Sequence, residues 1–427
     1  MVRNVLICTV LLLGIDGTAR ATQLFTVDSA LDEPDIDVGD GICRSAGGAC
    51  TLRAAVMEAN AQSASSVVVN LPSRTYFVTQ PIDNLHPGVG GSFVLSASSF
   101  GSTTVSIVGT DAAQTIIDGS LIDRLFTIEG ARNVTFANLT IRNGFATATQ
   151  GGGIWNNGTL TLDHVVVTKC RAVEGGGIFN GSSGTLSIVD SSIADNVANF
   201  GGGLLSAGTI DISTSTFAAN AAAEGGGIYA EGNAYLTNAT IAGNHATDNG
   251  GGIVSDLAAN AVISIYNTTI AYNYADSDAD NAGSGGGVYV HSGNLFNLFN
   301  TLVAGNYHIN PAFADDCYGS VHTHAYNRFG NLSQCVITPV SGAYALLNSL
   351  DDLGPLQDNG GATPTVALLA GSNAINAAAP ICVDAFSKPI SKDQRGFPRN
   401  VGNCDIGAFE YGSIDPNDTI FADGFGG

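Results

Sequence analysis

The sequence predicts an all-β protein that folds as a right-handed parallel β-helix, a solenoid of about ten coils of 24–26 residues each. A glycine triplet followed by an aliphatic residue recurs at intervals of 24 to 26 residues, with a last interval of 35. The triplets begin at Gly151, Gly175, Gly201, Gly225, Gly250 and Gly285. Asparagine recurs at a second fixed place, three residues after an apolar residue. Short runs of alternating polar and apolar residues, typical of half-buried strands, separate these marks.

The glycine triplet and the recurring asparagine both have a physical reason in a solenoid, because each coil pairs with its neighbours about 4.8 Å away. Glycine at a corner permits positive φ and removes the clash between stacked turns. Stacked asparagine side chains satisfy backbone groups that the turns would otherwise bury unpaired. The predicted stack consists of Asn196, Asn220, Asn244, Asn273 and Asn306. Cys170 occupies the same slot in the first full repeat, so we interpret it as a buried structural thiol.

An export signal is predicted for residues 1–21. Arg3 gives a positive start, residues 5–15 are an apolar run, and small residues supply a cleavage pattern, so we place cleavage after Ala21. The apolar run is too short to span a bilayer. We therefore expect a protein that is secreted or held at the bacterial cell surface.

Four segments are expected after the signal. Residues 22–62 form an N-terminal cap, whose amphipathic helix begins near Leu52. Residues 63–310 carry the coils, which are less regular at first. Residues 311–412 supply the last coils and a disulfide-containing C-terminal cap, because a solenoid has to cover its apolar ends. Residues 413–427 form a flexible tail.

The charge balance excludes several kinds of partner. The chain holds 15 Lys and Arg residues against 37 Asp and Glu residues, a net charge of −22. Such a surface repels DNA, RNA and anionic lipid, so nucleic-acid binding is rejected. We expect no transmembrane segment after the signal. A monomer is the default expectation for the oligomeric state.

The cysteines suggest a disulfide framework, which is consistent with an oxidising compartment. Three pairs lie close together in the sequence: Cys43–Cys50, Cys317–Cys335 and Cys382–Cys404. Spacing alone leaves the connectivity open.

Motifs near the N-terminus carry a family resemblance. Cys50–Ala55, followed by Glu58–Asn60, resembles the CSLREA-type domain of bacterial surface proteins, with Thr and Ala replacing its Ser and Glu. Phe25–Val27 and Gly39–Gly41 belong to the same resemblance.

The repeats and the C-terminal region resemble related families. The Gly-Gly-Gly-Ile and Phe-Ala-Ala-Asn units are similar to the repeats of polymorphic outer membrane proteins, and to the broader pectin-lyase-like β-helix class. Leu353–Gly361, Asp393–Gly396 and Cys404–Glu410 are similar to the choice-of-anchor Q region, and Ile420–Phe425 resembles a short tail found on such proteins. These resemblances imply export and a surface location, and they imply no assigned reaction.

One set of side chains is a candidate catalytic site. Enzymes of the pectin-lyase-like class use acidic calcium ligands with an Arg or Lys base, or clustered Asp with a His. Asp163, His164, Lys169 and Arg142 lie on neighbouring predicted coils and could form such a set; the alternative is a solvated outer face. Asp315–Asp316 matches the anchor-family loop better than a catalytic pair, and paired carboxylates need a separation across the sugar that sequence does not give.

Calcium is the one cofactor considered. Asp35, Asp37 and Asp40 resemble an oxygen-rich loop, although the spacing is irregular and a terminal Glu is missing. The insertion in the 35-residue interval offers acids at alternate positions, Asp276, Asp278 and Asp280.

A row of large residues is a candidate binding strip. The residue after each Gly-Gly-Gly-aliphatic unit is Trp155, Phe179, Leu205, Tyr229, Val254 or Tyr289. If the aliphatic residue points inward, these side chains point outward and could hold sugar rings or a partner protein. They fail in that role if they prove to be buried.

The sequence therefore favours a non-enzymatic secreted or cell-surface scaffold, used for adhesion or for contact with a polysaccharide or a surface protein. A polysaccharide lyase or glycosidase acting on an acidic glycan is the first alternative. A purely structural surface protein is the second.

Overall fold

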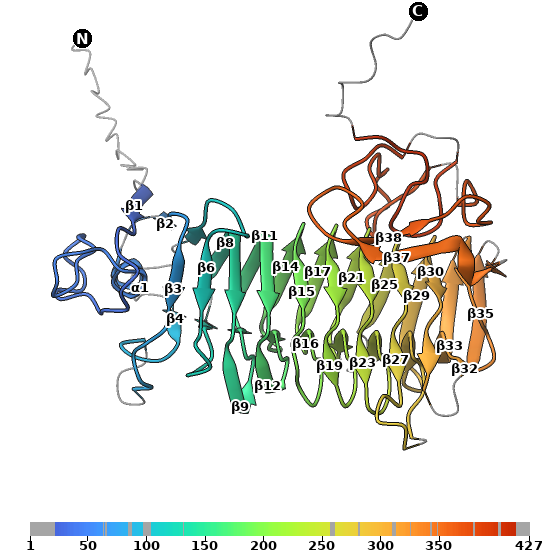
Figure 1. Cartoon of the computed structure of the whole chain (residues 1–427), viewed down its shortest axis with the longest axis horizontal. Coiled ribbons are helices and arrows are strands. Elements are labelled where there is room, and N and C mark those ends of the chain that lie inside the picture. The colour runs from blue at the N-terminus through green and yellow to red at the C-terminus, as the bar shows by residue number, and fades with distance from the viewer. Residues whose placement is uncertain are drawn as a thin grey trace, which may run out of the picture.

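The computed structural model describes residues 22–62, 64, 66–83, 88–96, 104–130, 132–256, 261–280, 282–309, 313–324, 326–341, 344–347, 349–378, 381–399 and 403–415. The predicted signal peptide and the end of the predicted tail lie outside these residues. The described chain is a right-handed parallel β-helix, as predicted, with one helix at its N-terminal end and a folded segment along one side (Figure 1).

Two adjoining faces of the solenoid belong to the largest sheet. Its strands pair in parallel from coil to coil, and the long strands β8 and β11 bend through the corner between the two faces. The first face contains β1 (Thr22–Thr26), β2 (Ser66–Asn70), β5 (Thr104–Val108), β8 (Asn133–Arg142), β11 (Thr159–Thr168), β14 (Thr185–Val189), β17 (Thr209–Ser213), β21 (Ala234–Thr237), β25 (Val262–Tyr266), β29 (Leu295–Phe299), β33 (Cys317–His324) and β35 (Cys335–Ser341). The second face contains the later halves of β8 and β11 with β3 (Thr75–Phe77), β6 (Ile116–Asp118), β15 (Ser192–Ala194), β18 (Thr216–Ala218), β22 (Thr240–Ala242), β26 (Thr269–Ala271), β30 (Leu302–Ala304), β34 (Asn327–Phe329) and β36 (Tyr344–Leu346).

Two narrower strips complete each coil. The third face contains β9 (Phe145–Gln150), β12 (Arg171–Glu174), β19 (Ala221–Ala222), β23 (His245–Ala246), β27 (Tyr274–Ala275), β31 (Tyr307–His308) and β32 (Phe313–Ala314). The fourth face, which follows the glycine triplets, contains β4 (Phe93–Ser96), β7 (Phe126–Glu129), β10 (Ile154–Asn156), β13 (Ile178–Asn180), β16 (Leu204–Ser206), β20 (Ile228–Ala230), β24 (Ile253–Ser255) and β28 (Val288–Val290).

The core runs down the middle of the solenoid as columns of apolar side chains. In one column Val134, Leu160, Leu186 and Ile210 sit in register, and each is at most 2% exposed. Such a column forms because alternate residues of a strand point inward and identical positions stack between coils. Burying one aliphatic side chain of this size contributes about 1.5–3 kcal/mol.

The asparagines form a hydrogen-bonded ladder at the corner between the second and third faces. The side-chain Oδ1 of Asn220 accepts the backbone N–H and the Nδ2 of Asn196, both at 3.0 Å. The same pair of bonds recurs from Asn220 to Asn244, from there to Asn273, and then to Asn306. All five side chains are fully buried, so the ladder satisfies polar groups that water cannot reach.

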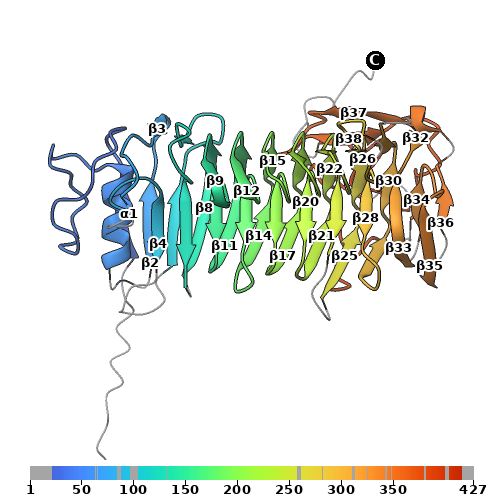
Figure 2. The same cartoon turned by 90° about the horizontal axis from the view of Figure 1, so that it is seen from below.

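Helix α1 (Leu52–Ala61) covers the N-terminal end of the stack beside β2 and β4 (Figure 2). The Thr51 side chain caps it by accepting the N–H of Ala54. Leu52, Val56 and two alanines are buried against the first coil. The disulfide Cys43–Cys50 holds the chain just before the helix.

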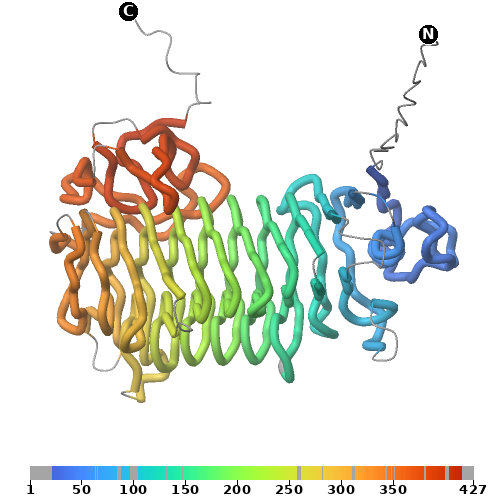
Figure 3. Tube along the Cα trace, turned by 180° about the vertical axis from the view of Figure 1, so that it is seen from behind, coloured from blue at the N-terminus to red at the C-terminus, as the bar shows by residue number. Residues whose placement is uncertain are grey.

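The C-terminal segment folds back along the flank of the solenoid (Figures 1 and 3). It contains a short 3-10 turn (Leu350–Asp352), β37 (Leu353–Gln357) and β38 (Thr365–Leu368), followed by irregular chain. Its apolar side chains pack on the second face, against the column Ala242, Ala271 and Ala304. The segment thus covers a side of the last coils rather than their end, where Val336 on β35 stays 62% exposed.

Candidate functional site

In seven successive coils, from β8 to β30, one residue turns the chain from the first face to the second. These corner residues all have positive φ, between 46° and 55°, a conformation that Asn, Asp and His adopt more readily than most residues. The corner row consists of Asn138, His164, Asp190, Thr214, Asn238, Asn267 and Asn300. Because the same backbone bend recurs, the polar side chains line up along one edge of the solenoid.

The C-terminal segment docks on the later part of this corner row. The Nδ2 of Asn238 donates to the carbonyl of Lys392, and the Nδ2 of Asn267 donates to the carbonyl of Val383, both at 2.9 Å. Gln394 is buried between the segment and the second face, where its amide contacts Thr216 and Thr240. These bonds fix the segment at the level of the later coils and leave the earlier corner residues uncovered.

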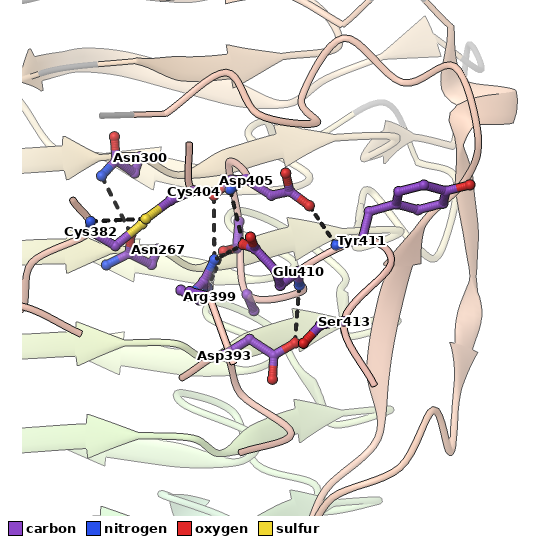
Figure 4. Close-up of polar contacts among 12 residues, drawn as sticks. Asn267, Asn300, Cys382, Asp393, Arg399, Cys404, Asp405, Glu410, Tyr411 and Ser413 are labelled. Carbon is purple, nitrogen blue, oxygen red and sulfur yellow. Dashed lines mark hydrogen bonds and ion pairs between the residues drawn. The ribbon is translucent and has the colours of Figure 1, made fainter. Parts of the chain in front are cut away.

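A buried ionic network holds the segment in shape (Figure 4). Arg399 donates to Glu410 at 3.2 Å and to Asn238 of the corner row at 2.9 Å, and Arg395 pairs with Asp393 at 2.6 Å. Burial raises the pKa of Glu410 to about 7 despite the nearby guanidinium of Arg399. Polar groups this deeply buried need fixed partners, so the network specifies one position for the segment.

A groove opens where the segment leaves the corner row. Its main cavity is about 490 Å³, within the range of about 300–1,000 Å³ typical of ligand sites. The lining joins His164, Asp190 and Thr214 of the corner row to the loop around Lys392. A second cavity of about 200 Å³ shares His164 and Asp190 and extends the groove towards the N-terminal coils. Within the described chain, no hydrogen bond engages the Asp190 carboxylate or the Lys392 ammonium group, so both are available to a ligand.

One of the predicted catalytic residues, His164, lines this groove, and Asp163 beside it contacts the imidazole. The Nδ1 of His164 lies 2.6 Å from a carboxylate oxygen of Asp163, and both side chains are about half exposed. Together with Asp190 they offer ligand atoms within 4.8 Å of one another. A carboxylate that orients an imidazole in this way leaves its other ring nitrogen free for proton transfer or metal binding.

The other two predicted catalytic residues lie elsewhere. Arg142 forms an ion pair with Asp118 at 2.7 Å, and Lys169 lines a separate cavity of about 360 Å³ with Arg171 and Asp195. The second-face part of β11 separates Lys169 from His164 along the coil. The four-residue set is therefore split between two corners, and of its members only His164 lines the groove.

The expected outward strip of large residues is mostly buried, which corrects that hypothesis. Phe179, Leu205, Tyr229 and Val254 are at most 8% exposed, and Trp155 and Tyr289 are half-buried at either end. The first glycine of each triplet has φ between 61° and 71° and folds the chain over the outside of the row. A Cβ on Gly250, for example, would meet the Val254 side chain at 2.3 Å. The row is therefore a second, minor core.

The calcium candidate near the N-terminus does not gather into a site. The two carboxylate oxygens of Asp35 accept the backbone N–H groups of Asp37 and Arg44, and Asp40 accepts that of Ile42. These acids build turns, so they are not directed at a common centre. The acids of the insertion, Asp276, Asp278 and Asp280, do come together.

The cysteines follow the prediction in two pairs and depart from it in the third. Cys43–Cys50 and Cys317–Cys335 are disulfides. Cys382 and Cys404 are buried thiols in contact, with the N–H of Cys382 donating to the Cys404 sulfur at 2.9 Å (Figure 4). Hydrogen bonding between them raises the pKa of Cys382 and lowers that of Cys404 to about 7, because the Cys404 sulfur is the acceptor.

Cys170 and Asp316 lie at the two ends of the asparagine ladder. The Cys170 N–H donates to Asn196 at 3.0 Å, and burial raises the pKa of the thiol to about 12, so Cys170 has a structural environment. Asp316 accepts the N–H and the Nδ2 of Asn306, at 3.0 and 2.8 Å, just as a further asparagine would. Asp315 accepts the N–H of Gly285, so this acidic pair is used in the fold.

Comparison with known proteins supports little beyond this description. No protein-family model matches the sequence, and no curated protein matches it. The crystal structure of pectate lyase Pel9A is similar over 92% of this chain and 97% of that chain, at 14% identity and a TM-score of 0.46. A likeness this distant transfers no activity. The CSLREA and choice-of-anchor resemblances remain predictions. In the described part of the chain, no helix is both long and apolar enough to cross a membrane.

Proposed function

We propose that the chain is an exported scaffold that binds polysaccharide in the groove between the corner row and the C-terminal segment. The observation that carries this proposal is the groove itself, in which Asp190 and Lys392 present unengaged polar groups on opposite walls. Hydroxyl-rich ligands need such donors and acceptors at fixed positions, and a regular solenoid offers them at the coil repeat of about 4.8 Å. Export agrees with the predicted signal and with the two disulfides.

The net charge narrows the expected ligands. At −22 the protein repels polyanions, so a neutral glycan should bind directly. An acidic glycan should bind only when a divalent cation screens the Asp163, His164 and Asp190 cluster.

A second candidate function is cleavage of an acidic glycan as a lyase or glycosidase. The Asp163–His164 contact favours it, because an oriented imidazole is a suitable general base. Cleavage would also require a group that stabilises the developing negative charge, and Lys392, which lines the same groove, is a candidate.

The test is retention of the protein, from Thr22 onward, on neutral and acidic polysaccharides, with and without Ca²⁺. Asp190→Asn and Lys392→Ala should each weaken retention at least tenfold. Asp195→Asn is a matched control, because Asp195 is an acid of positive φ at the next corner of the same coil. Lys388→Ala is the second control, an exposed lysine of the same segment.

The appearance of new polysaccharide chain ends in the same assay would favour the lyase or glycosidase function. His164→Gln should then abolish this cleavage while the protein is still retained on the glycan. Equal retention of all four groove and control variants would rule out the groove as the binding site. No retention on any glycan would leave a structural role or a protein partner.

A further inference from the structure

The longest interval between glycine triplets contains an acidic loop that follows β27. The loop carries carboxylates at alternate positions, Asp276, Asp278 and Asp280, and one oxygen from each lies within 4.8 Å of the others. In Figure 1 the loop extends from the lower edge of the solenoid, on the opposite side from the C-terminal segment. It is therefore separate from the groove described above.

The loop is pinned to the backbone of the preceding coil at Asp248. The N–H of Asp276 donates to the carbonyl of Asp248 at 3.3 Å, and Gly283 packs so closely on the Asp248 backbone that a Cβ would lie 2.2 Å from its carbonyl oxygen. Burial and then the charges of the three loop acids raise the pKa of Asp248. In the described residues, no lysine or arginine forms an ion pair with Asp248, Asp278 or Asp280.

A buried histidine on the following coil points at the same cluster. His308 pairs in register with Ala275, next to the loop, and its side chain is only 6% exposed. Its Nδ1 makes no hydrogen bond and lies 3.6 Å from a carboxylate oxygen of Asp276. The ring stacks on Phe313, with 4.7 Å between centroids, which holds it in this orientation. The Nδ1 is therefore a buried polar atom that faces the acidic cluster and makes no hydrogen bond in the described residues, which is uncommon in folded proteins.

We propose that Asp276, Asp278 and Asp280, with Asp248 beside them, bind a divalent cation of the Ca²⁺ class. Ca²⁺ takes six to eight oxygen ligands, and acids at alternate positions of a short loop are a common way to supply them. The buried imidazole of His308, 3.6 Å from the Asp276 carboxylate, is placed to hold that carboxylate when the cation is bound, as outer-shell partners of metal ligands commonly do. The cation fastens the insertion to the coil before it and the coil after it. This site is independent of the proposed glycan binding.

The direct test is calorimetric titration of CaCl₂ into the EDTA-treated full chain. We expect a saturable site at the acidic loop, separate from any cation held by the groove cluster, whose affinity falls at least tenfold in Asp278→Asn/Asp280→Asn. Asp37→Asn is the matched control, since it removes an exposed acid from the loop whose acids do not gather, and it should bind like the wild type. The wild type should also unfold at a higher temperature in Ca²⁺, and the double variant should not.

Two further measurements keep the proposal falsifiable. The single variant Asp280→Asn changes one exposed side chain, so it serves if the double variant fails to fold by circular dichroism. MnCl₂ replaces CaCl₂ in a parallel titration, and binding of Mn²⁺ that is lost in both the acid variants and His308→Gln would support the site with the imidazole as a direct ligand. No saturable binding of either cation, or equal affinity in the wild type and the acid variants, would overturn the proposal.

Discussion

Single side chains in the asparagine ladder carry a large share of the specificity of this fold. An asparagine inside the ladder makes four side-chain hydrogen bonds. The Oδ1 of Asn244 accepts the N–H and the Nδ2 of Asn220, and its Nδ2 donates to the Oδ1 of Asn273 and to the carbonyl of Phe217. The role of these asparagines can be predicted from the repeat alone. A polar residue that recurs at a buried corner has to form hydrogen bonds with the equivalent residues of the neighbouring coils. The same logic places a cysteine at the first rung and an aspartate at the last, where one set of partners is missing.

The ladder gives a prediction at this scale. Asn244→Ala should destabilise the protein by about 3–5 kcal/mol. It removes the acceptor of the Asn220 N–H and Nδ2 and the donor to the Phe217 carbonyl, at about 1–3 kcal/mol for each buried group. The change in stability is measured from the midpoint of urea unfolding, for variants whose free energy of unfolding depends on urea concentration with the same slope. Asn199→Ala, at an exposed position, is the control and should shift it by less than about 0.5 kcal/mol. Similar shifts for the two variants would mean that the ladder bonds add little.

The corner row was not predicted from the sequence. His164, Asp190 and Thr214 each lie three residues before the inward apolar residue that marks a repeat. That spacing was present in the sequence, but the residue type varies among Asn, Asp, Thr and His because the position demands positive φ rather than one chemistry.

At the scale of the coil, the glycine triplets determine how closely neighbouring turns approach. The middle glycine of a triplet lies against carbonyl oxygens of the next coil, and a Cβ on Gly226 would meet those of His245 and Gly251 at 2.4 and 2.5 Å. Two backbones that are held by parallel pairing cannot separate locally. The triplet also explains why the row of large residues is buried, which the alternation of a single strand could not reveal.

Gly226→Ala should therefore destabilise the fold by more than about 4 kcal/mol, or prevent soluble expression. Gly243→Ala is the matched control in the same coil, because Gly243 has a positive φ of 67° and open space around it. Its cost should be about 1–2 kcal/mol, the strain of a left-handed residue. Soluble yield and the urea midpoint are measured for both. If the control proved equally damaging, backbone strain rather than crowding would be the reason.

For the whole molecule, buried carboxyl groups set the response to pH. Burial raises the pKa of Asp316 and of Glu410 to about 7, from ordinary values near 4. Both groups hold their proton more tightly in the folded state, so their contribution to stability is complete below about pH 4 and is lost as the pH rises through 7. Asp118 has the opposite shift, and its contribution is lost only in more acidic solution.

The protein should accordingly have a higher unfolding temperature at pH 5 than at pH 8, with a difference in stability on the order of 3 kcal/mol per group. Asp316→Asn/Glu410→Gln should flatten this dependence, because neither replacement titrates. The double variant also controls for the general repulsion of a chain with a net charge of −22. An unchanged slope in it would assign the dependence to that repulsion.

The sequence by itself determined the solenoid, the period of the coils, the asparagine ladder and the helix at the N-terminal end. These features are local or periodic, so neighbouring coils repeat the same physical requirement and the pattern reveals it. Tertiary structure alone decided where the C-terminal segment lies, how it creates the groove with His164 and Asp190, and which acids gather at Asp276. The contacts that dock the C-terminal segment join residues more than 100 positions apart, such as Thr216 with Gln394, and no period relates them. They depend on the shape of a folded flank, which exists only once the coils have stacked.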